Sequence, residues 1–296
     1  MSSRSETDPV ASPSLWWDGL VRGDAHPPLE TDATAQYAIV GGGYTGLWTA
    51  YFLKLIQPDA DIVLVEAQRI GHGASGRNGG WLMGALEGCA AFVDDTGVLP
   101  IAAMQQLTQL VSRAGDVLKK EGIDCDFYHG GCVMAAARHD IQVGRARKML
   151  DDFWRLGFTE DDYHWLTPQE LGERIRVSNP GGAVFTPHVA RIHPAKLVTG
   201  LAGVVEALGV RIFEHTRAHR ITPGLLNCDR GSIHTEQVVI ATEGYSESGN
   251  PLYRRMIPVQ TGMVATEPLS DKQWSTLGFH QNETFADCTR AATYLQ

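Results

Sequence analysis

The chain has 296 residues, of which 43% are hydrophobic and 20% charged, a composition typical of a globular protein that buries a sizeable core. A net charge of −9 with no basic stripe argues against nucleic-acid binding, and the lack of any run of about 18 uncharged apolar residues argues against a membrane span. The five cysteines form no CxxC pair and the N-terminus lacks a signal-peptide pattern, so we expect a cytoplasmic protein without disulfides.

The first elements in the chain predict a strand–helix–strand unit. Residues 1–34 form a polar arm, and we expect the Trp16–Trp17 pair to anchor it to the body of the protein, with partner binding as the alternative. Residues 37–40 and 62–65 are apolar runs typical of buried strands, and residues 44–57 between them carry apolar side chains at helical spacing. Such a unit crosses over right-handed and builds a parallel sheet.

The middle of the chain mixes helices and strands without regular alternation. Helices are predicted over residues 100–122 and 138–156, with a short strand-like segment between them. Thr167, followed by Pro168 and by Glu170 three residues on, marks another helix start. This mixture is typical of a separate α+β domain.

An α/β pattern returns after His193, with a helix that ends at Gly209 and strands up to Thr242. We therefore expect an α/β fold whose Rossmann-like domain is discontinuous, with the α+β substrate domain inserted into it. The predicted division is an arm at 1–34, a nucleotide-binding domain at 35–86 and 194–248, and a substrate domain at 87–193 and 249–296.

A glycine motif directly after the first strand predicts dinucleotide binding. Gly41, Gly43 and Gly46 fit the pattern GxGxxG, in which the glycines permit a tight turn, close approach to a pyrophosphate and close helix–strand packing. The following helix directs free N–H groups and the positive end of its dipole at the phosphates. Glu66, at the end of the second strand, is placed to accept hydrogen bonds from ribose hydroxyls.

The loop after the second strand indicates which dinucleotide binds. It contains Ser75, Arg77, Asn78, Gly79 and Gly80 in a long polar turn that NAD enzymes rarely need. A flavin pyrophosphate and ribityl chain would use such donors, so the loop favours FAD. A surface ion pair is the alternative role for Arg77.

Residues 38–80, with the runs IVGGGYTGL and GASGRNGG, closely resemble the D-amino-acid oxidase-like superfamily of FAD-dependent oxidoreductases. Within it the chain is most similar to the gamma-glutamylputrescine oxidoreductase group. Residues 210–218, 238–245 and 264–269 are also similar to family segments, the last to a strand of the substrate domain and its exit turn.

The resemblance implies a Rossmann-like FAD-binding domain of the GR2 type, noncovalently bound FAD and oxidation of an amine or amino acid. The cofactor-binding residues that we expect are Gly41, Gly43, Tyr44, Thr45, Gly46, Glu66, Ala67, Ser75, Arg77, Asn78, Gly79, Gly80, Ala218, Ala241 and Thr242. Compatible substrates are gamma-glutamylputrescine-like amines, glycine or sarcosine, and D-amino acids. Hydride transfer to flavin N5 would give an imine, and either oxygen or an electron-transfer partner would be the acceptor.

The resemblance leaves two alternatives open. In that family the chain returns to the FAD domain and covers the flavin, and nothing in this sequence matches that return, so we expect a fold that is incomplete at its C-terminus. A catalytically inactive FAD-binding fragment is therefore one alternative. An NAD(P)-dependent dehydrogenase is the other, which the loop at 70–80 argues against.

No residue pattern identifies a catalytic side chain or a metal site. His215 and His219 are four residues apart in a strand-and-turn segment, with no carboxylate or cysteine completing a ligand set, so we expect no metal. His72 lies in the flavin-side loop without establishing a covalent link. Arginines that could bind a substrate carboxylate are Arg191, Arg254, Arg255 and Arg290, which the sequence does not rank.

Overall fold

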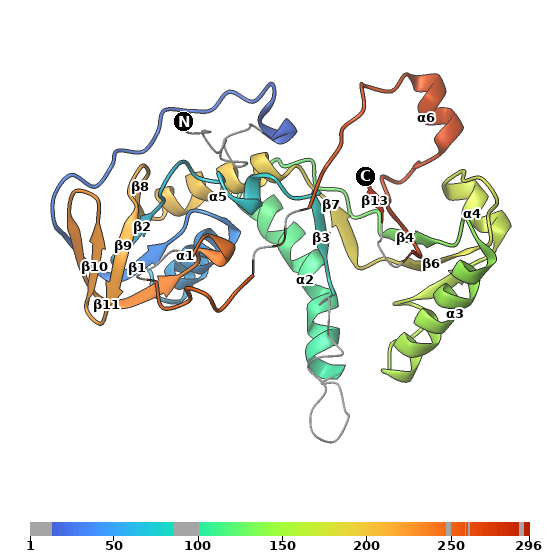
Figure 1. Ribbon diagram of the computed structural model, residues 1–296, viewed down its shortest axis with the longest axis horizontal. Coiled ribbons are helices and arrows are strands. Elements are labelled where there is room, and N and C mark those ends of the chain that lie inside the picture. The colour runs from blue at the N-terminus through green and yellow to red at the C-terminus, as the bar shows by residue number, and fades with distance from the viewer. Residues whose placement is uncertain (1–13, 86–100, 247–249, 258, 260, 290–292) are drawn as a thin grey trace, which may run out of the picture. The chain divides into compact units, whose positions relative to one another are not determined.

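The computed structural model describes residues 14–85, 101–246, 250–257, 259, 261–289 and 293–296. Contacts divide the chain into two compact units. The first comprises Met1–Asn78 and Pro194–Met263, and the second comprises Gly79–His193 and Val264–Gln296 (Figure 1). Among the described residues, no helix is both long and apolar enough to cross a membrane.

The first unit is built around a mixed sheet (Figure 1). Its elements are the 3-10 helix η1 (Leu15–Trp17), β1 (Ala33–Val40), α1 (Tyr44–Ile56), β2 (Ile62–Val65), the 3-10 helix η2 (Ala74–Gly76), α5 (Pro194–Ala207), β8 (Arg211–Phe213), β9 (Ala218–Thr222), β10 (Leu225–Cys228), β11 (Ser232–Ile240) and the 3-10 helix η4 (Glu243–Tyr245).

The strand order of this sheet is β8-β2-β1-β11-β10-β9. The strands β8, β2, β1 and β11 run parallel, and β10 and β9 continue from β11 as antiparallel strands. Numbered along the chain, the parallel strands have the order 3-2-1-4 of the doubly wound nucleotide-binding fold. The predicted Rossmann-like unit is confirmed, and the antiparallel strand β10 is an element that the sequence pattern did not reveal.

Both faces of β1 are covered, which explains why its last four residues are all buried. Ala38 and Val40 face a core cluster that includes Leu29 of the N-terminal arm and Leu226 of β10. Because side chains alternate along a strand, Ile39 faces the opposite side, where α1 packs. The arm therefore contributes to the core of this unit.

The N-terminal arm is held to the first unit by its tryptophans, as predicted. The indole Nε1 of Trp16 donates to the carbonyl oxygen of Asn78 at 2.7 Å. The guanidinium of Arg22 lies 3.6 Å from the ring centroid of Trp17 and donates through Nη2 to the Ile70 carbonyl oxygen at 3.3 Å. Strand β1 begins at Ala33, slightly before the end of the polar arm expected from the sequence.

The second unit contains a five-stranded sheet of order β13-β12-β4-β6-β5 and a separate two-stranded ribbon, β3-β7, among its described residues. Its elements are β3 (Trp81–Met83), α2 (Ile101–Lys120), β4 (Cys132–Ala135), α3 (Asp140–Arg155), β5 (His164–Leu166), α4 (Pro168–Arg174), β6 (Ala183–Thr186), β7 (Val189–Arg191), α6 (Asp271–Leu277), β12 (Thr284–Asp287) and β13 (Tyr294–Leu295). The mixed architecture agrees with the predicted α+β character.

The predicted capping box at the start of α4 is present. Thr167 Oγ1 accepts a hydrogen bond from the Glu170 N–H at 3.3 Å, and Glu170 Oε2 accepts one from the Thr167 N–H at 2.8 Å. These reciprocal bonds satisfy two backbone donors, at Thr167 and Glu170, that the helix itself cannot pair.

The strand expected over residues 264–269 does not form, so this prediction is wrong. The segment is extended and exposed, with Val264 93% accessible, and no described strand pairs with it. A single strand gains little without a hydrogen-bonded neighbour, because its backbone groups then pair with water as well as they would unfolded. The resemblance of this short segment to a family strand was therefore an insufficient signal.

Candidate functional site

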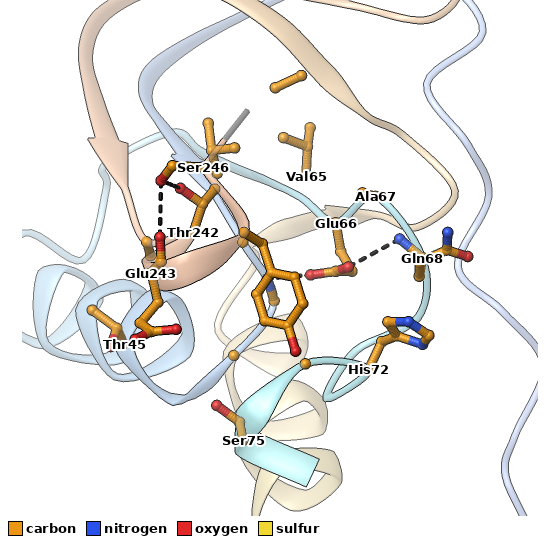
Figure 2. A pocket seen from close by; sticks show the side chains of 18 of the residues that line it. Thr45, Val65, Glu66, Ala67, Gln68, His72, Ser75, Thr242, Glu243 and Ser246 are labelled. Atoms are coloured by element: carbon orange, nitrogen blue, oxygen red, sulfur yellow. Dashed lines mark hydrogen bonds between the residues drawn. The ribbon is translucent and has the colours of Figure 1, made fainter. Parts of the chain in front are cut away.

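A cavity of about 470 Å³ opens where the parallel strands of the first unit end (Figure 2). Its walls are the segments that follow β1, β2, β8 and β11, together with the 3-10 turn η2. In sheets of this order, the gap between the first and fourth strands is the switch point at which ligands bind. The volume lies within the range of small-molecule sites.

Two glycines allow the turn after β1 to pack tightly beside this cavity. Gly41 has φ +114°, and a Cβ built there would overlap the backbone carbonyl oxygen of Ala241 at the end of β11. A Cβ on Gly46 would overlap the Gly41 carbonyl oxygen and lie 3.2 Å from Ile39 Cγ2. The two positions therefore require glycine for local packing, as the motif predicts.

The N-terminus of α1 lies at the cavity. The Tyr44 N–H donates to Ser75 Oγ at 2.9 Å, so an oxygen atom from the loop already occupies one donor of the helix end. A Cβ on Gly43 would lie 2.8 Å from that Ser75 oxygen, so the side chain of any other residue would push the serine away. A helix end of this kind provides N–H groups and a positive dipole end for an anion.

Glu66, at the end of β2, lines the cavity with a half-buried carboxylate (Figure 2). Its Oε2 accepts from the Gly42 N–H at 2.8 Å and its Oε1 from the Gln68 N–H at 2.9 Å. Burial raises the pKa of this carboxyl, the two backbone hydrogen bonds oppose the rise, the charge of Glu214 adds to it and that of Arg217 opposes it. Each oxygen keeps a further lone pair for a ligand hydroxyl.

The opposite wall is held by hydrogen bonds after β11 (Figure 2). Ser246 Oγ lies 2.8 Å from Thr242 Oγ1 and donates to the Glu243 carbonyl oxygen at 2.9 Å. Asn250 Nδ2 donates to Thr242 Oγ1 at 3.0 Å. These bonds fix an otherwise irregular turn as one wall of the cavity.

The residues around the cavity fit the adenosine diphosphate part of a dinucleotide. The N-terminus of α1 faces the cavity as an anion site, and Arg217 adds a cationic side chain to the lining. The Glu66 carboxylate accepts hydroxyl donors of the kind that a ribose offers. Charge and hydrogen-bonding capacity therefore match phosphates at one part of the cavity and a sugar at another.

Ten of the fifteen predicted cofactor-binding residues line this cavity. They are Gly41, Gly43, Tyr44, Thr45, Glu66, Ala67, Ser75, Ala218, Ala241 and Thr242. They come from the segments after β1, β2, β8 and β11, from the start of α1 and from η2. The fold therefore brings together residues that separate sequence motifs predicted one by one.

The other five predicted residues do not line the cavity. Gly46 packs α1 against the turn after β1, as described above. Arg77 Nε donates to the His72 carbonyl oxygen at 2.6 Å, and Asn78 Nδ2 donates to the Ser75 carbonyl oxygen at 3.0 Å, so both side chains brace the loop. Gly79 and Gly80 belong to the second unit and lead into β3. Direct contact of these five with a cofactor stays a prediction.

Several lining residues were not predicted from the sequence. They are Val40, Gly42, Val65, Gln68, His72, Gly73, Ala74, Thr216, Arg217, Glu243, Gly244, Tyr245, Ser246 and Asn250. Eight of them are the last residue of a parallel strand or lie within four residues after it, a position where ligands bind in sheets of this class. Applying that rule to every predicted strand would have identified Thr216 and Glu243.

The structure supports neither a metal site nor a choice among the candidate substrate arginines in its described part. Within the described part of the chain, no group of three or more histidine, cysteine or acidic side chains is placed to hold a metal, and His219 instead contacts Asp229. Arg191 lies on β7 with its guanidinium 4.7 Å from the ring centroid of Tyr128. Arg290 lies outside the described residues.

Comparisons with known proteins agree with this fold. The chain is 28% identical over 275 residues to gamma-glutamylputrescine oxidoreductase of Escherichia coli (strain K12), covering 90% of this chain and 62% of that protein. The structure resembles glycine oxidase from Geobacillus kaustophilus, with TM-score 0.59, 22% identity and coverage of 75% of this chain and 58% of that one.

It also resembles L-amino acid deaminase from Proteus myxofaciens, with TM-score 0.59, 19% identity and coverage of 75% of this chain and 48% of that one. The chain thus spans less than two thirds of the length of these relatives. The model of the DAO family, FAD dependent oxidoreductase, matches residues 36–295. The chain belongs to the DAO family of FAD-dependent oxidoreductases.

Proposed function

We propose that this chain binds FAD noncovalently and oxidises the C–N bond of a small amine or amino acid. The observation that carries the proposal is the cavity at the 3-2-1-4 switch point, where a glycine turn, a helix N-terminus and the Glu66 carboxylate converge. The substrate class is supported by the name of the Escherichia coli relative, gamma-glutamylputrescine oxidoreductase.

The residues of the cavity have separate roles in this proposal. The backbone of Gly43 and Thr45, at the N-terminus of α1, holds the pyrophosphate, and Glu66 accepts hydrogen bonds from the adenosine ribose. The turn ending at Ala218 holds the adenine, and Thr242 holds the wall beside the pyrophosphate. All of these roles are hydrogen bonds and packing contacts, and the proposal assigns no covalent bond to the cofactor.

When bound, FAD supplies the oxidising chemistry, the acceptance of a hydride equivalent from the carbon next to the amine nitrogen. The protein orients the cofactor through the groups named above and excludes water from the reacting atoms. We assign no catalytic side chain. We further propose that the first unit is the FAD-binding domain and the second the substrate domain, with oxygen or an electron-transfer partner as the final acceptor.

The test is the visible absorption spectrum of the purified chain, followed by anaerobic addition of amines. We expect a bound-flavin spectrum that an amine or amino acid bleaches, and the amine that bleaches it names the substrate class. Candidates for addition are gamma-glutamylputrescine, sarcosine, glycine and D-amino acids. A flavin spectrum that none of them bleaches would leave FAD binding without turnover, and a colourless, folded chain that binds NAD would overturn the proposal.

The variant Glu66→Gln sharpens this test. It keeps the size of the side chain and one carbonyl oxygen but replaces the other acceptor by an amide donor. We expect it to weaken FAD binding while the chain stays folded. The exposed variant Asp61→Asn, whose carboxylate contacts Arg211 at the opposite end of β8, is the matched control and should bind FAD as the unaltered chain does.

A further inference from the structure

A buried carboxylate behind the cavity joins three segments that are far apart in sequence. Glu214 directly follows β8, and its side chain is 2% exposed. Its Oε1 accepts from the Ile70 N–H at 2.5 Å, and its Oε2 accepts from the His26 N–H at 2.7 Å. The Nε of Arg69 lies 3.2 Å from Oε2 and 3.3 Å from Oε1.

The contacts tie the N-terminal arm to the loop after β2. Besides its bond from the backbone N–H, Glu214 Oε2 lies 3.3 Å from Nδ1 of His26, an ion-pair distance without hydrogen-bond geometry. Arg69 Nη2 also donates to the Gly23 carbonyl oxygen at 2.8 Å. The arm and the loop are therefore joined both through the carboxylate and directly.

The segments joined in this way form part of the cavity wall. Ala67 and Gln68 precede Arg69 and Ile70 in the same loop, and both line the cavity. Thr216, which also lines it, donates through Oγ1 to the Glu214 carbonyl oxygen at 2.9 Å and accepts from the Leu29 N–H at 3.0 Å. Glu214 and the arm are themselves absent from the lining.

The loop from Glu66 to Ile70 is also held by other hydrogen bonds, among them Glu66 N–H to the Phe213 oxygen at 2.8 Å and Arg22 Nη2 to the Ile70 oxygen at 3.3 Å. Its backbone pairs with the β8–β9 turn through the His215 N–H to Gln68 oxygen and the Thr216 N–H to Glu66 oxygen bonds, both 2.9 Å. A buried carboxylate is costly unless hydrogen bonds and a cation satisfy it, and Glu214 has both. Burial opposes ionisation, yet the bonds from Ile70 and His26 and the charge of Arg69 hold the pKa of the Glu214 carboxyl below its usual value.

We propose that Glu214 is a positioning residue of the cofactor site, and that through it the N-terminal arm, from Gly23 to Leu29, is part of the structure that holds FAD. The proposal rests on the proposed FAD binding and adds residues that do not touch the cavity. It assigns to the arm a function in cofactor retention, exerted from behind the wall formed by Ala67, Gln68 and Thr216.

Glu214 also acts on Glu66 through its charge. Burial raises the pKa of Glu66, hydrogen bonds from Gln68 and Gly42 oppose this, Glu214 raises it further and Arg217 lowers it. FAD affinity should fall on acidification, because a protonated Glu66 loses its charge and one of its two acceptor oxygens for the ribose becomes a donor. Removing the charge at position 214 should therefore move this loss of affinity to lower pH.

The test compares the variant Glu214→Gln with the unaltered full chain. Glutamine keeps the shape and one acceptor, but it leaves the Ile70 or the His26 N–H without its carboxylate and Arg69 without its ion pair. We expect the Kd for FAD, measured on the apoprotein by quenching of flavin fluorescence, to rise about tenfold or more, and the acid loss of affinity to move to lower pH. A structural role alone would not produce the second effect.

Two further variants complete the design. Arg69→Gln removes the cation but leaves both backbone hydrogen bonds to Glu214, so it should fold and weaken FAD binding severalfold, and it carries the test if Glu214→Gln does not fold. Asp61→Asn removes a carboxylate that contacts Arg211 at the other end of β8 and should leave the Kd unchanged.

The outcomes separate this inference from the proposed function. If the unaltered chain binds FAD and Glu214→Gln and Arg69→Gln bind it equally well, the inference is overturned and the proposed cofactor stands. A Glu214→Gln variant that binds FAD more weakly but loses affinity at the same acid pH as the unaltered chain would also overturn the inference. The carboxylate would then contribute only to folding. An unaltered chain that binds no FAD overturns both.

Discussion

Replacing Gly46 by alanine tests whether the third glycine of the motif is required for packing. Alanine is normally the better helix residue, favoured over glycine by about 1 kcal/mol in a helix interior. At Gly46, however, the added Cβ would overlap the Gly41 carbonyl oxygen and lie 3.2 Å from Ile39 Cγ2. The overlapped atom is a backbone atom of the turn after β1, and a backbone atom cannot move away by changing rotamer.

The two effects oppose each other, and their magnitudes decide the sign. Overpacking in a well-packed interior costs about 1–3 kcal/mol. Because the overlapped atom is backbone, we take the upper part of that range, about 2–3 kcal/mol. Subtracting a propensity gain of about 1 kcal/mol then leaves a net destabilisation of about 1–2 kcal/mol for Gly46→Ala. The displaced Gly41 turn should also weaken FAD binding, because the backbone of that turn lines the cavity.

The matched control is Gly203→Ala in α5 of the same unit. No atom lies within 4 Å of a Cβ built at Gly203, so only the propensity term remains and a stabilisation of up to about 1 kcal/mol is expected. Urea unfolding and FAD titration of both variants provide the measurements. If Gly46→Ala were as stable as Gly203→Ala and bound FAD normally, the packing argument would be refuted.

Three other predictions concern ionisation and capping. The Kd for FAD should rise on acidification through a pKa above that of an ordinary glutamate, because burial raises the pKa of Glu66 and the charged carboxylate accepts from the ribose more strongly than the protonated acid. A pH titration of Kd that shows no such rise contradicts this. Thr167→Ala should cost about 1 kcal/mol in chemical unfolding by removing the cap of α4, whereas Thr276→Ala, on the exposed face of α6, should cost less. Burial raises the pKa of the Cys132 thiol to about 11, so alkylation at pH 8 should be slow in the folded chain and fast in urea.

Local patterns were sufficient to predict the elements whose formation depends on near neighbours. The helix start at Thr167 was visible because its capping partner, Glu170, is three residues away. The turn at Gly41 was visible because strand, glycines and helix follow one another directly. In both cases the signal itself lies within a few residues, so a short window of sequence contains it, although the Gly41 turn also packs against the distant Ala241.

Side-chain direction in the loop at 70–80 was not predictable in the same way. Arg77 and Asn78 were expected to contact the cofactor, and the structure uses both to hydrogen-bond carbonyl oxygens of their own loop. A polar side chain near a binding site can hydrogen-bond either a ligand or carbonyl oxygens of its own loop. Composition does not distinguish the two, because the choice depends on where each carbonyl points.

The sequence by itself determined the βαβ unit, the place of Gly41, Gly43 and Glu66 at the ends of its strands, and the family to which they point. Only the tertiary structure decided that β11 lies next to β1, that Thr242 and Arg217 therefore line the same cavity, and that Glu214 joins the arm to the loop. The physical reason is that motif contacts are local, whereas the contact between Glu214 and His26 spans 188 residues and forms only when the sheet is assembled.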